Sequence, residues 1–220
     1  MSNRLSGLYA ITDPILTPPA TVVGQVAAAL RGGARIIQLR DKSEDYQQRL
    51  QLAQQLRALT LQHDALLIIN DDVEICQEAD ADGVHLGQDD MDLPMARSIL
   101  GPDFIIGATC HGSIELAEQA LEESADYLAF GRFFPSQTKP EAPPVALETI
   151  RDFILRCPVP AVAIGGITLN NAAPLIKAGF EMLAVVQDIF GRSDVETQCQ
   201  RYADLFYSLA PAQTHADVFS

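Results

Sequence analysis

Short apolar runs alternate with amphipathic segments along almost the whole chain. Eight of these runs are short and rich in aliphatic residues, which is typical of strands buried on both faces. The predicted strands are residues 8–12, 36–39, 66–69, 83–85, 104–108, 127–130, 161–164 and 182–186. The segments between them favour helices, which we expect at residues 22–30, 46–61, 73–79, 94–100, 114–123, 147–155, 171–178 and 195–209.

This regular alternation predicts the fold class. Eight strand–helix pairs within 220 residues, without an interruption large enough for a second domain, favour an α/β fold of the (β/α)8 TIM-barrel type. We assign residues 1–209 to this single domain and expect residues 210–220 to form a loosely ordered tail. A doubly wound open sheet is the alternative, but no Gly-x-Gly-x-x-Gly turn of dinucleotide-binding sheets follows the first strand.

Composition narrows the choice of partners. The hydrophobic content of 48% is sufficient for a large core, and 15 basic against 29 acidic residues give a net charge of −14. Nucleic acids and membranes are anionic, so this charge argues against both and favours small-molecule partners held by local positive groups. Self-association into a homo-oligomer is left open.

The N-terminus and the cysteines indicate a cytoplasmic protein. The chain enters its first strand without the apolar region of a signal peptide, and no run reaches the roughly 18 to 20 apolar residues of a membrane span. The four cysteines are far apart and form no Cys-x-x-Cys pair, so neither a zinc site nor a disulfide framework is indicated. Free thiols fit a cytoplasmic setting.

Carboxylates gather where the third and fourth predicted strands end. Asn70, Asp71 and Asp72 follow the third strand, and Asp89 and Asp90 follow the fourth. Neighbouring barrel strands lie about 5 Å apart, so these strand ends should meet at one rim. Mg²⁺ binds one or two carboxylates and completes its shell with phosphate oxygens and water, and we assign it to Asp71 and Asp90. One of each pair could instead cap the following helix, a role that suits Asp72 and Asp89 better.

Positive charge follows the second predicted strand. Alternation along an extended segment places Gln38, Arg40 and Lys42 on one side. If that side faces the rim, an amide and two cations reach one pocket, where arginine and lysine are suited to binding phosphate. The alternative is that these cations form solvated salt bridges with Asp41 or Glu44.

The longest stretch without periodicity, residues 131–144, follows the sixth predicted strand. Its Ser136, Thr138 and Lys139 are suited to closing over a phosphate group and excluding water from a reactive intermediate. Long loops inside compact domains are usually functional or disordered. This loop is therefore a candidate part of the site.

Glycines follow the seventh predicted strand, and a turn follows the eighth. Gly165-Gly166 and the Val186-Gln187 turn lie where such barrels usually hold phosphate on backbone N–H groups. A simple tight turn at the glycines is the alternative. Among the histidines, we expect His85 to be a packed or hydrogen-bonded residue rather than a catalytic one.

Five of these segments, in order and at compatible spacing, resemble thiamine-phosphate synthase. The resemblance spans about residues 8–190 and is carried by Gln38-Leu39-Arg40-Asp41-Lys42, Ile69-Asn70-Asp71-Asp72, His85-Leu86-Gly87-Gln88-Asp89-Asp90, Phe133-Phe134-Pro135-Ser136-Gln137-Thr138-Lys139 and Ala163-Ile164-Gly165-Gly166-Ile167. It implies a transferase that condenses 4-amino-2-methyl-5-(diphosphooxymethyl)pyrimidine with a thiazole phosphate. The products would be thiamine phosphate and diphosphate, formed by Mg²⁺-assisted, dissociative departure of diphosphate.

The resemblance also implies roles for individual residues. Those implied to bind the pyrimidine diphosphate are Gln38, Leu39, Arg40, Asp41, Lys42, Asn70, Thr109 and Lys139, of which Arg40, Lys42 and Lys139 are also implied to be catalytic. Those implied to bind the thiazole phosphate are Ser136, Gln137, Thr138, Gly166, Val186 and Gln187, and the implied Mg²⁺ ligands are Asp71 and Asp90. Positions 109 and 187 are often serine in this family; Thr109 keeps the hydroxyl, but Gln187 does not.

Other functions compete with this interpretation. A thiazole tautomerase of the same fold resembles the synthase but lacks its full magnesium and diphosphate set. A non-catalytic thiazole-phosphate or thiamine-phosphate binding protein would keep the glycines but does not need Asp71, Asp90 and Lys139 together. A sugar-phosphate isomerase or an indole-forming synthase would call for a general acid–base pair, and none stands out in the sequence.

Overall fold

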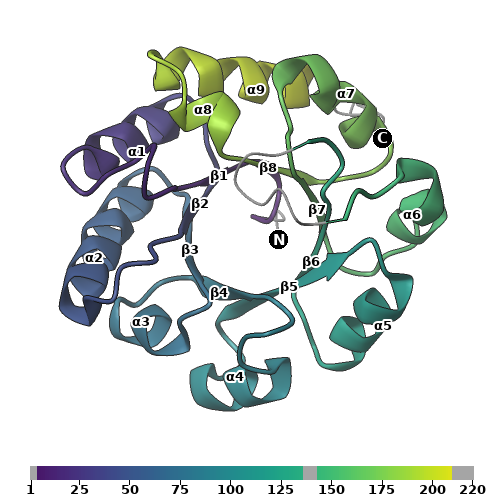
Figure 1. Cartoon of the computed structure of the whole chain (residues 1–220), viewed down its shortest axis with the longest axis horizontal. Helices are drawn as coiled ribbons and strands as arrows, with labels where there is room; N and C mark the ends of the chain where they lie inside the picture. The colour runs from purple at the N-terminus through teal and green to yellow at the C-terminus, as the bar shows by residue number, and fades with distance from the viewer. Residues whose placement is uncertain (1–3, 136–142, 210–220) are drawn as a thin grey trace, which may run out of the picture.

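A closed barrel of parallel strands forms the centre of this computed structural model, which describes residues 4–135 and 143–209. The strands pair in chain order, and the eighth pairs with the first (Figure 1). They are β1 (Gly7–Ile11), β2 (Ile36–Leu39), β3 (Leu66–Asn70), β4 (Gly83–Leu86), β5 (Ile105–His111), β6 (Tyr127–Phe130), β7 (Ala161–Ile164) and β8 (Met182–Val185). The predicted (β/α)8 barrel is confirmed.

Helices surround the barrel on its outside, as Figure 1 shows. They are α1 (Val22–Arg31), α2 (Tyr46–Gln62), α3 (Val73–Glu78), α4 (Leu93–Leu100), α5 (Ile114–Glu122), α6 (Leu147–Ile154), α7 (Leu169–Lys177), α8 (Gln187–Phe190) and α9 (Val195–Leu209). The sequence predicts all of these except α8, which is a single turn and too short to show helical periodicity. The expected tail at residues 210–220 lies outside the described residues.

Because all strands are parallel, their carboxyl ends lie at one rim, which we call the mouth of the barrel. This geometry brings the chain after β2, β3 and β4 to neighbouring positions. Most strand boundaries differ from their predictions by at most one residue, but β5 continues to His111 rather than ending at Ala108. Its pairing with β6 shifts between Thr109 and His111, as at a bulge, so Thr109 belongs to the strand itself.

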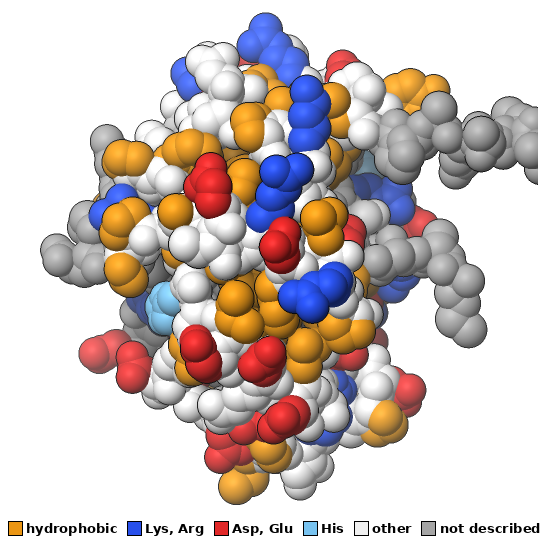
Figure 2. Space-filling view, turned by 90° about the vertical axis from the view of Figure 1, so that its right-hand side faces the viewer, with side chains coloured by type: hydrophobic (Ala, Val, Ile, Leu, Met, Phe, Trp, Pro, Cys, Tyr) orange, Lys and Arg blue, Asp and Glu red, His pale blue; other side chains and the backbone are white. Residues whose placement is uncertain are grey.

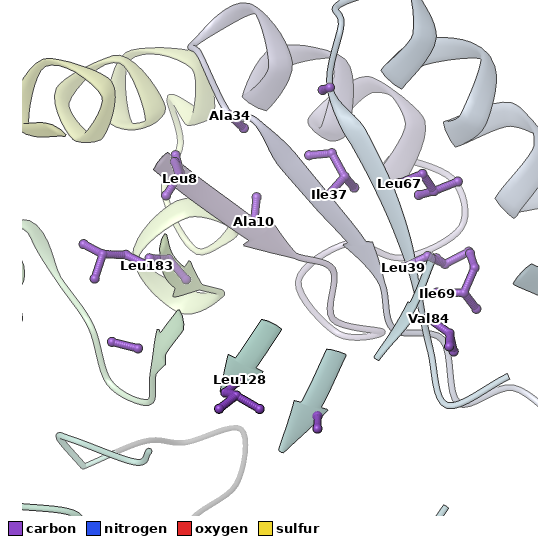
Figure 3. Close-up of a cluster of buried hydrophobic side chains, with 14 of the residues drawn as sticks. Leu8, Ala10, Ala34, Ile37, Leu39, Leu67, Ile69, Val84, Leu128 and Leu183 are labelled. Carbon is purple, nitrogen blue, oxygen red and sulfur yellow. The ribbon is translucent and has the colours of Figure 1, made fainter. Parts of the chain in front are cut away.

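Strand alternation divides the core into two layers. Side chains that point into the barrel, among them Tyr9, Ile68 and Tyr127, pack with one another in the interior. Side chains of the opposite parity, among them Leu39 and Ile69, pack between barrel and helices, where Figure 3 shows them. Gln38 is therefore placed on the interior side, and Leu39 on the helix side.

Three carboxylates stabilise the amino-terminal end of the barrel, opposite the mouth. Asp82, Asp126 and Glu181 each precede an even-numbered strand and accept a backbone N–H from the odd-numbered strand before it. Asp82 accepts from Leu67 N–H at 2.8 Å and from Arg57 Nη1 at 2.7 Å. Each of the three carboxylates thus connects two neighbouring strands, so these residues serve the fold.

Helix caps confirm one prediction and correct another. Asp72 accepts a hydrogen bond from Ile75 N–H, as expected of an N-cap, and Ser113 makes the same contact with Leu116 N–H at the start of α5. Asp89 does not cap α4. That helix begins at Leu93, and Asp92 accepts the Met95 N–H, because an N-cap must directly precede the first helical residue.

The four cysteines are free thiols. Among the helices in the described part of the chain, none combines the length and apolar character that a bilayer span requires. On the face drawn in Figure 2, acidic and basic side chains are intermixed with apolar ones.

Candidate active site

Charged residues from β2 and β3 meet at the mouth. Lys42, just beyond β2, donates a hydrogen bond to Asp71 Oδ2 with a distance of 2.6 Å. Asp71 has φ 66°, a left-handed conformation that aspartate tolerates better than most residues, and its N–H donates to the His85 carbonyl of β4. The contact is therefore anchored to three neighbouring strands.

Asp90, which follows β4, completes this cluster. Its carboxyl group lies within hydrogen-bonding reach of Asp71, and Gly87 N–H holds its Oδ2 at 2.8 Å. Burial and the neighbouring Asp71 raise the pKa of Asp90. Burial also opposes ionisation of Asp71, but hydrogen bonds with Lys42 and Asp90 outweigh it and lower the pKa of Asp71. Two carboxyl groups thus interact with each other, and one of them also pairs with a lysine.

This pair of carboxylates fits a magnesium ion. Burial first, and then the neighbouring Asp71, disfavour the charged form of Asp90 and raise its pKa, and a divalent cation would offset both effects. Within the described ranges, no group of three or more His, Cys, Asp or Glu side chains is arranged to hold a metal. Two carboxylates, with substrate oxygens and water as further ligands, are what Mg²⁺ commonly uses.

The magnesium effect on stability should depend on pH through Asp90. We expect the rise in melting temperature caused by Mg²⁺ with diphosphate to shrink as the pH is lowered from about 8 toward 5, because metal ligands must be deprotonated. Asp90, with a pKa above its ordinary 3.8, protonates before Asp71. Thermal unfolding with and without Mg²⁺ at each pH measures the effect.

The control is Asp90→Asn, in which the Mg²⁺ effect should be smaller and its pH dependence flatter. Without metal the sign reverses: because the folded-state pKa of Asp90 is raised, its contribution to stability is lost as the pH rises through that pKa. Identical pH profiles of the Mg²⁺ effect in the two proteins would contradict a ligand role for Asp90.

Arg40 lies on the other side of Lys42, toward β1. Its Nη1 is 3.9 Å from Asp13 Oδ2, and both side chains are mostly buried. The Arg40 N–H donates to Thr12 Oγ1 at 2.9 Å, which fixes the end of β2 against β1. The described ion pairs of Arg40 and Lys42 are thus with Asp13 and Asp71, not with the alternative partners Asp41 and Glu44.

A chain of hydrogen bonds crosses the barrel interior below these charges. Gln38 Nε2 donates to Tyr9 Oη at 2.8 Å, and Tyr9 Oη bonds to Tyr127 Oη at 2.9 Å. His85 continues the chain, with Nδ1 2.9 Å from Tyr127 Oη and Nε2 2.9 Å from Thr109 Oγ1. The chain connects Gln38 on β2 with Thr109 on β5, and the expected hydrogen-bonded role of His85 is confirmed.

The two tyrosines of this chain are neutral donors and acceptors. Burial raises the pKa of both Tyr9 and Tyr127 above the ordinary value of 10.0. The Tyr127 ring fits because residue 107 is glycine: a Cβ there would lie 2.0 Å from the Tyr127 Cζ. Sequence analysis did not single out Tyr9 or Tyr127, although each lies at an interior position of its strand with a polar tip.

The loop after β7 comes very close to the loop after β6. Gly166 has φ 62°, and a Cβ on it would lie 2.3 Å from the Pro135 carbonyl oxygen. Asn171 Nδ2 donates to the Gly166 carbonyl at 3.0 Å, and Asn171 Oδ1 accepts the Thr168 N–H at 2.8 Å. Glycine is therefore required here by both backbone conformation and space, which goes beyond the simple tight turn.

The turn after β8 leads directly into α8, whose first residue is Gln187. The first N–H groups of a helix have no acceptor within the helix. The Gln187 side chain is exposed, and its Nε2 lies 2.5 Å from where a Cβ on Gly191 would be, so it folds back along α8. The backbone of this turn, rather than the Gln187 carboxamide, is the group available to an anion.

Some of the predicted site residues lie outside the described residues, and the others lie at or near the mouth. Ser136, Gln137, Thr138 and Lys139 lie outside the described residues. Leu39 packs its side chain between barrel and helices, so a substrate contact there would involve its backbone. Asn70 ends β3, and Asp41 accepts a hydrogen bond from Ser43 N–H; both lie at the mouth, beside the charged cluster.

Comparison with known proteins shows the family of this chain. The family described as Thiamine monophosphate synthase matches residues 8–189. The thiamine-phosphate synthase of Alcanivorax borkumensis is 50% identical over 194 residues, covering 88% of this chain and 89% of that protein. That of Marinobacter nauticus is 50% identical over 198 residues, covering 89% of each.

A solved structure extends the likeness to the fold. Thiamine phosphate pyrophosphorylase from Pyrococcus furiosus superposes with a TM-score of 0.87 at 36% identity, covering 95% of this chain and 98% of that one. The family match covers most of the chain and includes the mouth residues on β2, β3 and β4. The chain therefore belongs to the thiamine monophosphate synthase family.

Proposed function

We propose that this chain catalyses the condensation of 4-amino-2-methyl-5-(diphosphooxymethyl)pyrimidine with a thiazole phosphate to give thiamine phosphate and diphosphate, and that it does so in the cytoplasm. Family membership supports the reaction. The observation that carries the assignment of residues is the contact of Lys42, Asp71 and Asp90 at the mouth. A cation beside paired carboxylates suits a diphosphate leaving group and Mg²⁺.

The pyrimidine diphosphate would bind between the interior chain and the charged mouth. Gln38 and Thr109, fixed by Tyr9, Tyr127 and His85, would contact the pyrimidine. The residues proposed to bind its diphosphate and adjoining atoms are Leu39, Arg40, Asp41, Lys42, Asn70 and Lys139. The fixed hydrogen-bonding groups reduce the cost of orienting the substrate.

Asp71 and Asp90 would hold Mg²⁺, with Lys42 beside them. When bound, Mg²⁺ supplies positive charge to the diphosphate oxygens as the leaving group develops its charge. Lys42 and Arg40 would contribute two further charges, and because Lys42 already contacts Asp71, its ammonium group is placed next to the metal ligands. Lys139 is proposed to bind the same diphosphate.

The bond changes need no protein nucleophile. The bond between the methylene carbon and the diphosphate oxygen breaks, and diphosphate leaves with the electron pair. The thiazole nitrogen then donates its lone pair to the methylene carbon. Burial raises the pKa of the Cys76, Cys110 and Cys199 thiols to about 12, so these groups are poor nucleophiles at neutral pH.

The thiazole phosphate would bind to the other half of the mouth. Gly166 and the Val186–Gln187 turn would offer backbone N–H groups to the phosphate, as the loops after the last two strands do in many barrels. Ser136, Gln137 and Thr138 are proposed to add contacts from the β6 loop. The close approach of Gly166 to Pro135 supports this, because it places the two loops together.

Omission of each component tests the proposal. Diphosphate release should require the pyrimidine diphosphate, the thiazole phosphate and Mg²⁺ together, with thiamine phosphate formed in equal amount. A thiazole tautomerase would convert the thiazole phosphate without releasing diphosphate. A binding protein would bind either ligand and release none, so either result would contradict the proposed reaction.

A further inference from the structure

Asp188 is a buried carboxylate that the proposed reaction does not use. It is the second residue of α8, and its side chain is only 4% exposed. Asp188 Oδ1 accepts hydrogen bonds from Nε and Nη2 of Arg192, one turn further along the chain. Its Oδ2 accepts from Leu169 N–H at 3.2 Å, Gln198 Nε2 at 2.9 Å and Tyr202 Oη at 2.8 Å.

These donors come from three separate elements. Leu169 is the first residue of α7, Gln198 and Tyr202 lie on α9, and Arg192 follows α8. Figure 1 shows α8 between the end of β8 and α9, with α7 next to α9. A buried carboxylate is stable only when its oxygens are hydrogen-bonded, and here both are. Asp188 is therefore the point at which α7, α8 and α9 are joined.

Asp188 joins these helices beside the backbone segments proposed to bind the thiazole phosphate. Leu169 begins α7 directly after the Gly165–Thr168 loop, and Asp188 directly follows the Val186–Gln187 turn. These are the two backbone segments proposed to bind the thiazole phosphate. The hydrogen bond between Leu169 N–H and Asp188 Oδ2 thus ties one half of the phosphate site to the other.

A helix as short as α8 cannot fix its own orientation. It contains four residues, and isolated helices of a single turn are unstable because nucleation is unfavourable. Its direction must come from tertiary contacts, of which those of Asp188 are buried and charge-assisted. Backbone N–H groups bind an anion only when they point at it, so the orientation of α8 determines the affinity of the site.

We propose that Asp188 is a positioning residue for the phosphate of the thiazole substrate. It holds the turn after β8 and the loop after β7 in the mutual arrangement in which their N–H groups converge. This inference rests on the proposed function and deepens it, because it assigns to the thiazole side a residue that touches no substrate. It predicts a defect confined to one of the two substrates.

The main test is Asp188→Asn, measured by steady-state kinetics with each substrate varied in turn. Asparagine has the same shape but lacks the charge that pairs with Arg192. We expect the KM for thiazole phosphate to rise by about 10- to 100-fold, because small displacements of positioning groups have effects of this size. The KM for the pyrimidine diphosphate, and kcat at saturating thiazole phosphate, should change by less than about threefold.

A matched control separates positioning from general stability. Asp82→Asn removes another carboxylate that accepts a backbone N–H and an arginine, but at the opposite end of the barrel. It should lower the unfolding midpoint and leave both KM values within about twofold. If Asp82→Asn raised the KM for thiazole phosphate as much as Asp188→Asn did, the effect would be one of stability and the proposal would be wrong.

A second variant keeps the carboxylate and removes the connecting hydrogen bond, together with the partly buried Leu169 side chain. Leu169→Pro lacks the N–H that Asp188 accepts. Proline is favoured at the first helical position, and Thr168 (φ −134°, ψ 164°) already has a backbone conformation compatible with a following proline. We expect the same selective rise in KM for thiazole phosphate, of about 3- to 10-fold. This variant answers the question even if Asp188→Asn fails to fold.

The outcomes are distinguishable. Absence of diphosphate release by the unmodified protein would refute the proposed function, and this inference with it. The positioning role alone would be refuted if the unmodified protein turned over normally while Asp188→Asn and Leu169→Pro left both KM values unchanged. It would also be refuted if these variants raised the KM values for the two substrates equally.

Discussion

Replacing Asp71 by asparagine should reduce turnover by about 10²- to 10³-fold or more, the loss typical when one charge-stabilising group is removed from an active site. Asparagine matches aspartate in shape and tolerates the left-handed backbone at φ 66°. Its oxygen can still accept the hydrogen bond from Lys42. What is lost is the negative charge that, with Asp90, would hold Mg²⁺. Diphosphate release at saturating substrates and Mg²⁺ measures the loss.

The neighbouring carboxylate provides the control for this variant. Asp72 caps α3 through Ile75 N–H and pairs with Arg49 at 2.9 Å, so it serves the fold rather than the mouth. Asp72→Asn should lower the free energy of unfolding by about 1 kcal/mol, the usual worth of a cap or a partly exposed ion pair, and keep turnover within a few-fold. Equal activity of the two variants would rule out a metal role for Asp71.

Replacing Gly166 by alanine should have the second large effect. The added Cβ would lie 2.3 Å from the Pro135 carbonyl oxygen and 2.8 Å from that of Phe134, both backbone atoms. Either the β6 loop or the β7 loop must move, and both are proposed to hold the thiazole phosphate. We expect the KM for thiazole phosphate to rise by about 10²-fold, measured with the pyrimidine diphosphate and Mg²⁺ saturating.

Gly101→Ala is the matched control. Gly101 also has a positive φ, 84°, but a Cβ there meets nothing within 4 Å. Both variants should therefore lose about 1–3 kcal/mol of stability from the positive φ alone. Only Gly166→Ala should also raise the KM. A comparable KM change in Gly101→Ala would attribute the effect to stability and remove the support for the phosphate assignment.

The barrel, and the meeting of charged residues at its mouth, could be predicted because both depend on local patterns of apolar and polar residues. Apolar runs identify the strands, and parallel pairing then places every strand end at one rim. Asp71 and Asp90 come together for this reason alone, although 19 positions separate them (90 − 71). Their role as metal ligands stays a prediction, made because two carboxylates at neighbouring strand ends repel each other unless a cation lies beside them.

Features that depend on side-chain direction could not be predicted. The contact between Tyr9 and Tyr127 joins residues 118 positions apart and requires both barrel closure and the space left by Gly107. Lys42 could be placed at the mouth, but its pairing with Asp71 rather than Asp41 depends on how the chain turns after β2. No sequence pattern specifies either contact.

Short elements and irregular ends account for the other differences. A single helical turn such as α8 has too few residues for periodicity, so neither it nor the hydrogen bonds of Asp188 could be anticipated. The extension of β5 to His111 arises from a pairing irregularity that no local propensity encodes. Of the two cap candidates, Asp72 directly precedes the first residue of its helix and caps it, whereas Asp89 does not directly precede α4, whose cap is Asp92.

The most direct test measures the binding of Mn²⁺, as a substitute for Mg²⁺, in the presence of diphosphate. Electron paramagnetic resonance of the free ion reports how much Mn²⁺ is bound. The proteins compared are the unmodified chain and its Asp71→Asn, Asp90→Asn and Asp72→Asn variants. We predict one site per chain whose affinity falls at least about tenfold in the first two variants and is unchanged in the third. Retention of full affinity in both Asp71→Asn and Asp90→Asn would contradict the claim that carboxylates from two neighbouring strands jointly hold the cation.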